Sequence, residues 1–296
     1  GGPPPLTLAV VLTCPRCSIN APNYPCHVTR PGRHDAGQGA DPPAAARSRC
    51  LASCSVLPVA RRLAAVGLIA DNLDRVRDRI AAAAARAGRD PATVTLVAVT
   101  KNFPPATVEE ALAAGQTLFG ENRVQEAKAK IPQVSGRARW QMLGHLQSNK
   151  ARDAVALFEM IQSVDSVKLA QELDKWAARA GQRLPVLLEV NVAGEASKFG
   201  LKPEDAPAAL AEISQLARLD VRGLMTVAPY VAEADKVRPY FRRLRELRDR
   251  LGLAELSMGM SHDFEAAIEE GATIVRVGTA IFGERPRRQA AAENAD

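Results

Sequence analysis

The chain has 296 residues, of which 47% are hydrophobic and 24% charged, a composition typical of soluble globular proteins. This length suits one large α/β domain or two small ones. No apolar run reaches the roughly 18 to 20 residues that a membrane-spanning helix needs, so we expect that the chain is not a membrane protein.

The N-terminal segment carries most of the excess positive charge. Residues 1–66 hold seven arginines, no lysine and two aspartates, and therefore five of the six net positive charges of the chain. A protein that binds a phosphate backbone needs its basic residues clustered on the folded domain. We therefore expect no nucleic-acid partner. Nucleic-acid binding through the basic N-terminal segment remains an alternative.

The cysteines are also confined to this segment. No second pair follows Cys14 and Cys17 at the spacing of a zinc finger or ribbon, so we predict no metal site. A folded part without cysteine fits a reducing compartment, and we expect a cytoplasmic protein. The five cysteines are Cys14, Cys17, Cys26, Cys50 and Cys54.

The distribution of prolines suggests where the folded domain begins in the sequence. Half of the 20 prolines lie before residue 60, between stretches rich in glycine, alanine and arginine. Such a segment cannot bury enough apolar surface to offset its ordering entropy. We predict a disordered or spurious N-terminal extension (1–62), a folded domain (63–288) and a flexible tail (289–296).

The pattern of the chain changes at about Asn72. Apolar residues recur there at helical spacing, and Gly88 can end that helix. Eight short β-branched runs then alternate with helical patterns. The predicted strands are Val94–Thr100, Thr117–Glu121, Arg139–Leu143, Phe158–Ser163, Pro185–Val192, Val221–Val227, Leu253–Met258 and Thr273–Val277.

This alternation predicts an α/β fold with a single (β/α)8 TIM-type barrel. An open, doubly wound sheet is the alternative. In such a barrel the reactive side chains lie at the carboxyl ends of the strands. The residues that follow each predicted strand are therefore the candidate site residues.

Polar residues follow each of the first three strands. Lys101 follows a buried strand, where its charge is costly unless it is used, and a lysine at a barrel mouth can form a Schiff base with an aldehyde. The alternative is a solvated loop lysine. Asn122 either approaches a ligand or caps the next helix. His145 is typical of a hydrogen-bonded structural histidine.

The last two strands end in small and hydroxyl residues. Barrels often bind phosphate with the loops after these strands. Gly278 allows close approach of the backbone, and Ser261 and Thr279 can donate hydroxyl hydrogens. Arg276 lies between two valines of the last strand, and its buried charge needs either an ion pair or a ligand atom.

These motifs resemble those of the pyridoxal phosphate homeostasis proteins, relatives of the alanine racemase N-terminal barrel. The resemblance runs from about Ile69 to Gly283, and the motifs keep the order and spacing of the family. The segments that carry it are Val97–Lys101, Gly120–Glu126, Gly144–Lys150, Glu189–Asn191, Lys198–Gly200, Gly223–Thr226, Ser257–Ser261 and Arg276–Gly283.

The resemblance implies that Lys101 holds pyridoxal 5′-phosphate (PLP) as a Schiff base. It also implies that Arg276 lies near the pyridine nitrogen. Gln141 stands where the family usually has a histidine, which puts in doubt a role for a histidine there but not the cofactor site. Residues implied around the phosphate are Ser261, Gly278 and Thr279, and residues implied around the ring are Asn122, Met225 and Met258.

The function that the resemblance implies is non-catalytic. An arginine beside the ring nitrogen disfavours its protonation and weakens the ring as an electron sink. The chain ends at Asp296, which leaves no room for the further domain that gives racemases their second base. We expect a monomeric carrier acting in vitamin B6 homeostasis and amino-acid and keto-acid balance, with apo PLP enzymes as candidate partners. A PLP-dependent amino-acid racemase is the alternative.

Overall fold

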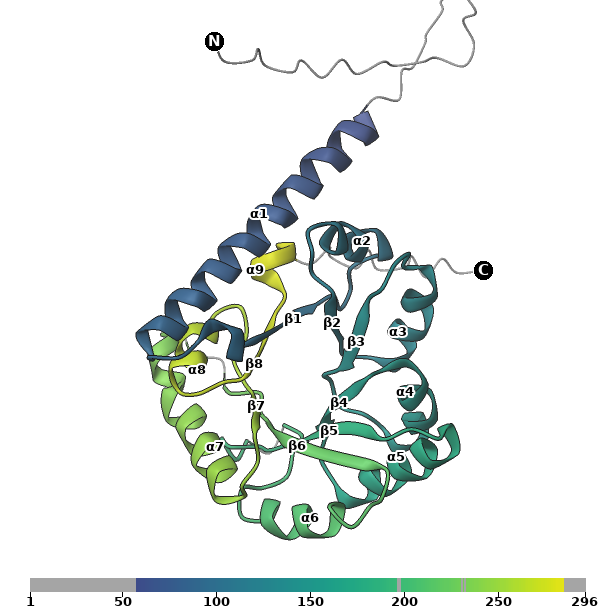
Figure 1. Cartoon of the computed structure of the whole chain (residues 1–296), viewed down its shortest axis with the longest axis vertical. Coiled ribbons are helices and arrows are strands. Elements are labelled where there is room, and N and C mark those ends of the chain that lie inside the picture. Colours follow the sequence, from purple (N-terminus) through teal and green to yellow (C-terminus); the bar gives the residue numbers. More distant parts are fainter. Residues whose placement is uncertain (1–56, 196–197, 230, 232, 285–296) are drawn as a thin grey trace, which may run out of the picture. The chain divides into compact units, whose positions relative to one another are not determined.

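The computed structural model describes residues 57–195, 198–229, 231 and 233–284 (Figure 1). All five cysteines and the predicted tail (289–296) lie outside these residues. The predicted N-terminal extension (1–62) lies outside them too, except for residues 57–62.

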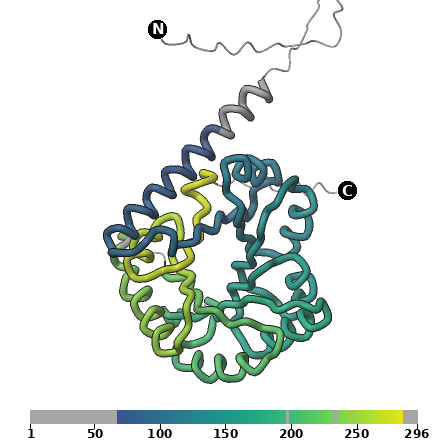
Figure 2. The backbone as a smooth tube through the Cα atoms, viewed as in Figure 1, coloured from purple at the N-terminus to yellow at the C-terminus, as the bar shows by residue number. Residues whose placement is uncertain are grey.

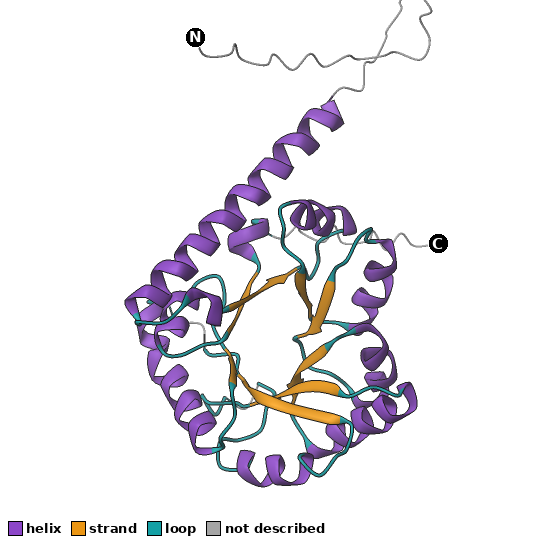
Figure 3. Ribbon diagram, viewed as in Figure 1, coloured by secondary structure: helices purple, strands orange, loops and turns teal. Residues whose placement is uncertain are grey.

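Eight parallel strands close into a barrel in sequence order, which confirms the predicted fold class. Figure 3 shows the strands as an inner ring with the helices around it. The strands are β1 (Thr95–Val99), β2 (Leu118–Glu121), β3 (Arg139–Met142), β4 (Met160–Val164), β5 (Leu184–Glu189), β6 (Leu219–Met225), β7 (Glu255–Ser257) and β8 (Ile274–Val277).

Pairing of the first strand with the last closes the barrel. Val97 lies opposite Arg276, and Ala98 lies opposite Val277. Figure 2 shows these two segments, at opposite ends of the folded chain, running side by side. As a result, the loop that follows β1 and the loop that follows β8 meet at the same end of the barrel.

Helices connect successive strands along the outside of the barrel. The α-helices are α1 (Leu57–Arg86), α2 (Pro105–Ala113), α3 (Val124–Lys130), α4 (Ala151–Leu157), α5 (Val167–Ala180), α6 (Ala206–Ile213), α7 (Arg238–Arg250), α8 (Phe264–Glu269) and α9 (Thr279–Phe282). Short 3-10 helices lie at Pro91–Thr93, Ile131–Gln133, Ser148–Lys150 and Ala234–Val237.

Helix α1 is longer than its apolar pattern indicates. The pattern predicts a helix from about Asn72, because the residues that pack against the domain, such as Leu73 and Val76, begin near there. The structure extends the helix back to Leu57, so the predicted boundary after residue 62 falls inside it. The helix packs against α2, α8 and α9. Gly88, with φ +65°, follows its last turn as predicted.

All eight predicted strands are present, with shifted ends. The largest shift is in β5, which ends at Glu189 rather than Val192. Val190 N still donates to Met225 O of β6 at 2.8 Å, and the chain then leaves the barrel: Asn191 N donates to Leu201 O at 2.9 Å, and Leu201 N donates to Glu189 O at 2.7 Å. These loop contacts replace the ladder, so the β-branched pattern alone overestimates the strand.

Two apolar cores follow from the alternation of side chains along each strand. Residues facing the lumen form the inner core, and residues facing outward pack against the helices in the larger outer core. Leu187, for example, lies in the inner core, whereas Leu188 lies in the outer one. The inner core consists of Val97, Val99, Leu118, Leu143, Met160, Leu187, Met225 and Ile274.

Neither a membrane span nor a metal cluster was found in the part of the chain that the structure describes. None of its helices is both long enough and apolar enough to cross a bilayer. No three histidine, cysteine, aspartate or glutamate residues in that part are grouped so as to hold a metal ion.

The close approach of β6 to β7 requires glycine at position 223. A Cβ on Gly223 would lie 2.0 Å from Glu255 O. Gly223→Ala should therefore lower the free energy of unfolding by about 1–3 kcal/mol, as other overpacked sites do, measured by chemical denaturation. Gly67→Ala in α1 is the control, because nothing lies within 4 Å of its Cβ. Equal stability of the two variants would contradict the packing argument.

Candidate functional site

A cavity of about 370 Å3 opens at the carboxyl end of the barrel. Its residues come from the ends of β1, β2, β3 and β6 and from the segments around β7 and β8. This is the end where barrel enzymes and binding proteins place their ligands. The cavity is lined by Val99, Lys101, Phe103, Asn122, Leu143, Val227, Met260, Ser261, His262, Arg276, Gly278 and Thr279.

Lys101 lies in the turn that follows β1 and is half-buried. The next residue, Asn102, has φ +66°, a left-handed conformation that asparagine tolerates better than most residues. Phe103 N then donates to Thr100 O at 3.0 Å and closes a tight turn. This turn holds Lys101 at the barrel mouth, where its side chain lines the cavity.

A buried ionic cluster fixes the turn from behind. Lys130 Nζ donates to Glu121 Oε1 at 2.7 Å, Glu126 Oε1 at 2.9 Å and Thr100 O at 2.8 Å. Glu126 Oε1 also accepts from Asn102 N at 2.5 Å. Burial raises the pKa of Glu121, while Lys130 lowers it. The cluster thus ties both residues next to the candidate lysine to helix α3.

Arg276 faces the lumen from β8 and is fully buried. Its Nη1 donates to Ser257 Oγ at 2.6 Å, and its Nη2 donates to Thr226 O at 2.7 Å. Burial lowers the pKa of Arg276 to about 10, against the raising effect of Glu189 and Asp263, so the guanidinium is charged at neutral pH. Among the described residues no carboxylate lies within ion-pair distance of it. A buried cation of this kind suits a ligand atom that accepts a hydrogen bond.

Hydrogen bonds continue from Arg276 through the lumen. Ser257 Oγ donates to Gln162 Oε1 at 2.5 Å, and Gln162 Nε2 donates to Gln141 Oε1 at 2.6 Å. Gln141 Nε2 donates to Glu159 Oε1 at 3.3 Å. Gln141 therefore lies below the cavity and does not line it, so the departure from the family histidine leaves the lining of the cavity unchanged.

The turn after β8 is built around the Ser261 hydroxyl. Gly278 N and Ala280 N each donate to Ser261 Oγ at 3.2 Å. Both lone pairs of that oxygen are then used, which leaves its own hydrogen to be donated. A Cβ on Gly278 would lie 3.2 Å from Val99 O, so glycine allows the turn to approach β1 closely. Thr279 begins α9 and is exposed at the cavity edge.

The structure brings six of the eight predicted residues to this cavity. The two methionines do not line it. Met225 is fully buried in the inner core, and Met258 is fully buried in the outer core between barrel and helices. Because side chains alternate along a strand, Ser257 takes the lumen-facing position and Met258 points outward. The six residues are Lys101, Asn122, Ser261, Arg276, Gly278 and Thr279.

Several lining residues were not predicted from the sequence. Phe103 stacks obliquely on Phe282, with ring centroids 5.2 Å apart, and covers one side of the cavity. Leu143, one residue beyond β3, belongs to the inner core and forms part of the floor. The proximity of Phe103 to Lys101 in sequence is a signal that could have identified it. Val99, Val227, Met260 and His262 complete the unpredicted set.

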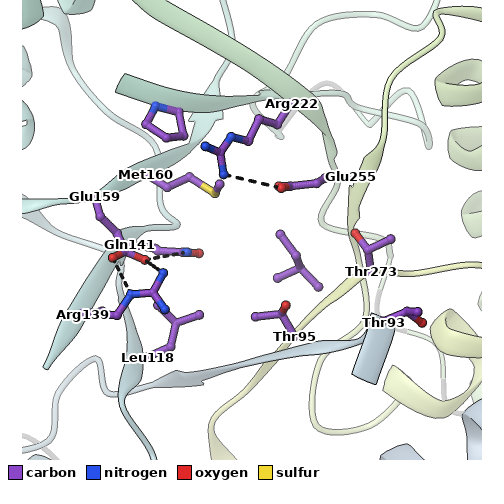
Figure 4. A pocket seen from close by; sticks show the side chains of 12 residues that line it. Thr93, Thr95, Leu118, Arg139, Gln141, Glu159, Met160, Arg222, Glu255 and Thr273 are labelled. Atoms are coloured by element: carbon purple, nitrogen blue, oxygen red, sulfur yellow. Dashed lines mark hydrogen bonds and ion pairs between the residues drawn. The ribbon is translucent and has the colours of Figure 1, made fainter. Parts of the chain in front are cut away.

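A polar pocket of about 500 Å3, which we call the amino-end pocket, opens at the opposite end of the barrel (Figure 4). Its lining includes residues at the beginnings of strands, such as Thr95 and Leu118. Arg139 pairs there with Glu159 at 2.8 Å, and Arg222 lies 3.9 Å from Glu255. In barrels this end usually serves stability, and none of the predicted site residues lies in it.

Known proteins resemble this chain over most of the barrel. Residues 72–286 match the family "Alanine racemase, N-terminal domain". A pyridoxal phosphate homeostasis protein of Pseudomonas aeruginosa is 50% identical over 220 residues, which cover 73% of this chain and 96% of that protein. The chain belongs to the pyridoxal phosphate homeostasis protein family. The relative from Aquifex aeolicus is 44% identical over 222 residues and covers the same share of this chain.

Solved structures agree with this family membership. PipY of Synechococcus elongatus, solved with PLP bound, is 42% identical with a TM-score of 0.65, and the match covers 73% of this chain and all of PipY. An alanine racemase of Clostridium difficile is 18% identical with a TM-score of 0.56, and the match covers 75% of this chain and 58% of the racemase. The likeness to the racemase shows a common barrel fold only.

Stability should depend strongly on the buried cluster beneath the Lys101 turn. Lys130→Met leaves the Glu121 carboxylate buried without its cation, so the free energy of unfolding should fall by about 3–5 kcal/mol. Lys128→Met in the same helix is the control: Lys128 pairs with Asp153 at the surface, and its loss should cost about 1 kcal/mol or less. Chemical denaturation measures both. Similar losses in the two variants would contradict the role of the cluster.

Proposed function

We propose that this chain binds PLP in the carboxyl-end cavity, holds it as a Schiff base on Lys101 and acts without catalysis in intracellular vitamin B6 homeostasis and amino-acid and keto-acid balance. The observation that carries this proposal is that Lys101, Ser261 and Arg276, from three separate strand ends, line one cavity. The names of the curated relatives and the PLP-bound PipY structure support it.

The residues present fit the three chemical groups of PLP. Lys101 supplies a primary amine, which an aldehyde requires to form a Schiff base. Ser261 and Thr279 supply hydroxyl donors at a glycine turn, which suits a phosphate. Arg276 supplies a buried cation for the ring nitrogen, and a volume of about 370 Å3 is within the range of small-ligand sites.

Arg276 also argues for a holding role over catalysis. PLP supplies an electrophilic aldehyde and, in many enzymes, a protonated ring that accepts electrons. Arg276 is charged at neutral pH and is held by Ser257 and Thr226 in a fixed position. A cation fixed beside the ring nitrogen opposes its protonation. The site therefore favours retention of the aldehyde over chemistry that needs an electron sink.

Release to other proteins requires that the lysine can be reached. Lys101 is half-buried at a cavity that opens to solvent, which supports exchange with a competing amine. We propose apo PLP enzymes as recipients and a monomeric state. A cytoplasmic location is supported by the absence of cysteine from residues 55–296. The nearly balanced charge of residues 67–296 supports the absence of a nucleic-acid partner.

The Schiff base assignment is tested with Lys101→Ala. Purified wild-type protein should show visible absorbance and carry a borohydride-fixed label after incubation with PLP, and the variant should show neither. Lys168→Ala on the exposed surface of α5 is the control and should label as the wild type does. The fold of the variant is checked by circular dichroism. A Lys101→Ala protein that still carries the full label would contradict the assignment.

The racemase alternative is tested by turnover. If the chain is the proposed non-catalytic carrier, purified PLP-loaded protein should not interconvert D- and L-alanine above the rate of free PLP. Chiral chromatography measures the products over several hours. Sustained turnover that is lost in Lys101→Ala would favour the racemase over the carrier.

A further inference from the structure

A second cavity of about 260 Å3 adjoins the proposed PLP cavity. The two share three lining residues: Asn122, Leu143 and Val227. The second cavity extends from them over the ends of β3, β5 and β6. A molecule in it would therefore lie beside whatever occupies the first. The remaining lining residues are Gly144, His145, Glu189, Val190, Asn191, Lys198 and Phe199.

Glu189 is an unusual group in this second cavity. It is the last residue of β5, and it follows the lumen-facing Leu187 by two positions, so its side chain points to the same face. Only 8% of the surface of Glu189 is exposed to solvent. Its Oε2 is buried and has no hydrogen-bond partner among the described residues. A buried carboxylate oxygen without a donor is costly, which suggests that a ligand supplies one.

Asn191 adds a second oxygen of the same kind. Its Nδ2 donates to Glu195 O at 2.8 Å, which fixes the orientation of the amide. Its Oδ1 is then left buried, and no described residue donates to it. Both unsatisfied atoms are acceptors, so the matching ligand group carries several N–H donors and a positive charge. A primary ammonium has these properties.

N–H donors at the edge of the cavity indicate the other end of the ligand. Lys198 lines the cavity and is paired with Glu195 at 2.8 Å. His145 also lines it, with its ring stacked on Phe199 at 3.6 Å between centroids. A carboxylate of the ligand would meet N–H donors from these side chains. Together with the two acceptors, this arrangement matches an α-amino acid zwitterion.

We propose that the second cavity binds the amino group of an incoming α-amino acid, and that Glu189 accepts the proton which this ammonium must lose before its nitrogen can displace Lys101. The proposal rests on the proposed function and names the amine that competes for the site. Lys101 leaves as the new carbon–nitrogen bond forms and its own bond to the same carbon breaks. The two hydrogens that remain on the incoming nitrogen pass to the lysine nitrogen during this exchange, and Glu189 returns the proton that it took up. Lys101 therefore leaves as an ammonium, and charge and protons balance.

The charged surroundings of Glu189 support this role. Burial raises its pKa to about 7, Asp165 after β4 raises it too, and Arg276 on β8 lowers it. His145, which contacts Asp165 at 2.9 Å, and Lys198 are the other titratable groups that line the cavity. A carboxylate that is half ionised near neutral pH can both take up and release a proton. Its accepting form prevails above pH 7.

The test compares two amines in full-length protein loaded with PLP. L-Alanine is an ammonium at neutral pH and must lose a proton, whereas methoxyamine is already unprotonated. Glu189→Gln should slow the loss of the borohydride-fixable label at Lys101 with L-alanine by roughly 10²-fold and leave the rate with methoxyamine within about twofold. In the wild type, the L-alanine rate should show a rising inflection near pH 7 that the variant lacks.

Glu255→Gln is the matched control. Glu255 also has a buried Oε2 without a partner and a pKa raised by burial, but it lies in the amino-end pocket of Figure 4. Its substitution should leave both amine rates unchanged. A second readout uses unloaded protein: L-alanine should raise the melting temperature of the wild type but not of Glu189→Gln.

The outcomes separate this inference from the proposed function. Glu189→Gln protein that takes a full borohydride label and exchanges L-alanine at the wild-type rate overturns the inference alone. Equal slowing with both amines also overturns it, since a distorted site would produce that result. If Glu189→Gln does not fold, a wild-type profile without an inflection near pH 7 overturns it. Wild-type protein that takes no label at Lys101 overturns the proposed function and this inference with it.

Discussion

The parallel pairing of β1 with β8 is the constraint on which the site depends. Lys101 and Thr279 are far apart in the sequence, and only closure of the barrel brings their strand ends together. The pairing of Val97 with Arg276 sets the register of the two strands. The turn that holds Lys101 and the turn after β8 therefore open on the same cavity. An amine, hydroxyl donors and a buried cation then meet without any long loop to position them.

Two buried ionisable side chains, Arg276 and Glu189, lie at the carboxyl end of the barrel. Arg276 is held at both terminal nitrogens by neutral oxygens, while Glu189 keeps an oxygen without a donor. Each alters the pKa of the other, but no ion pair joins them within the described residues. A direct pair would satisfy both groups and leave nothing for a ligand. In the proposed arrangement, their separation leaves the cation for PLP and the carboxylate for the incoming amine.

The sequence predicts the barrel and half of the residues that line the carboxyl-end cavity, because strand ends in a closed parallel sheet must converge. Lys101, Arg276 and Gly278 follow from that rule and from their residue types. The resemblance alone implied Met258, which points outward because Ser257 takes the lumen-facing position of β7. Glu189 was not identified as a site residue because an unsatisfied carboxylate becomes visible only when burial and hydrogen bonding are known. The start of α1 at Leu57 was not predicted.

The hydrogen bonds below Arg276 all run in one direction, from a permanent cation through Ser257, Gln162 and Gln141 to the carboxylate of Glu159. Every link between the two ends is an uncharged hydroxyl or amide, which neither gains nor loses a proton in the physiological range. A histidine at position 141 would introduce a titrating group into this line. With glutamine there, the donor and acceptor roles along this line stay fixed when the acidity of the surroundings changes.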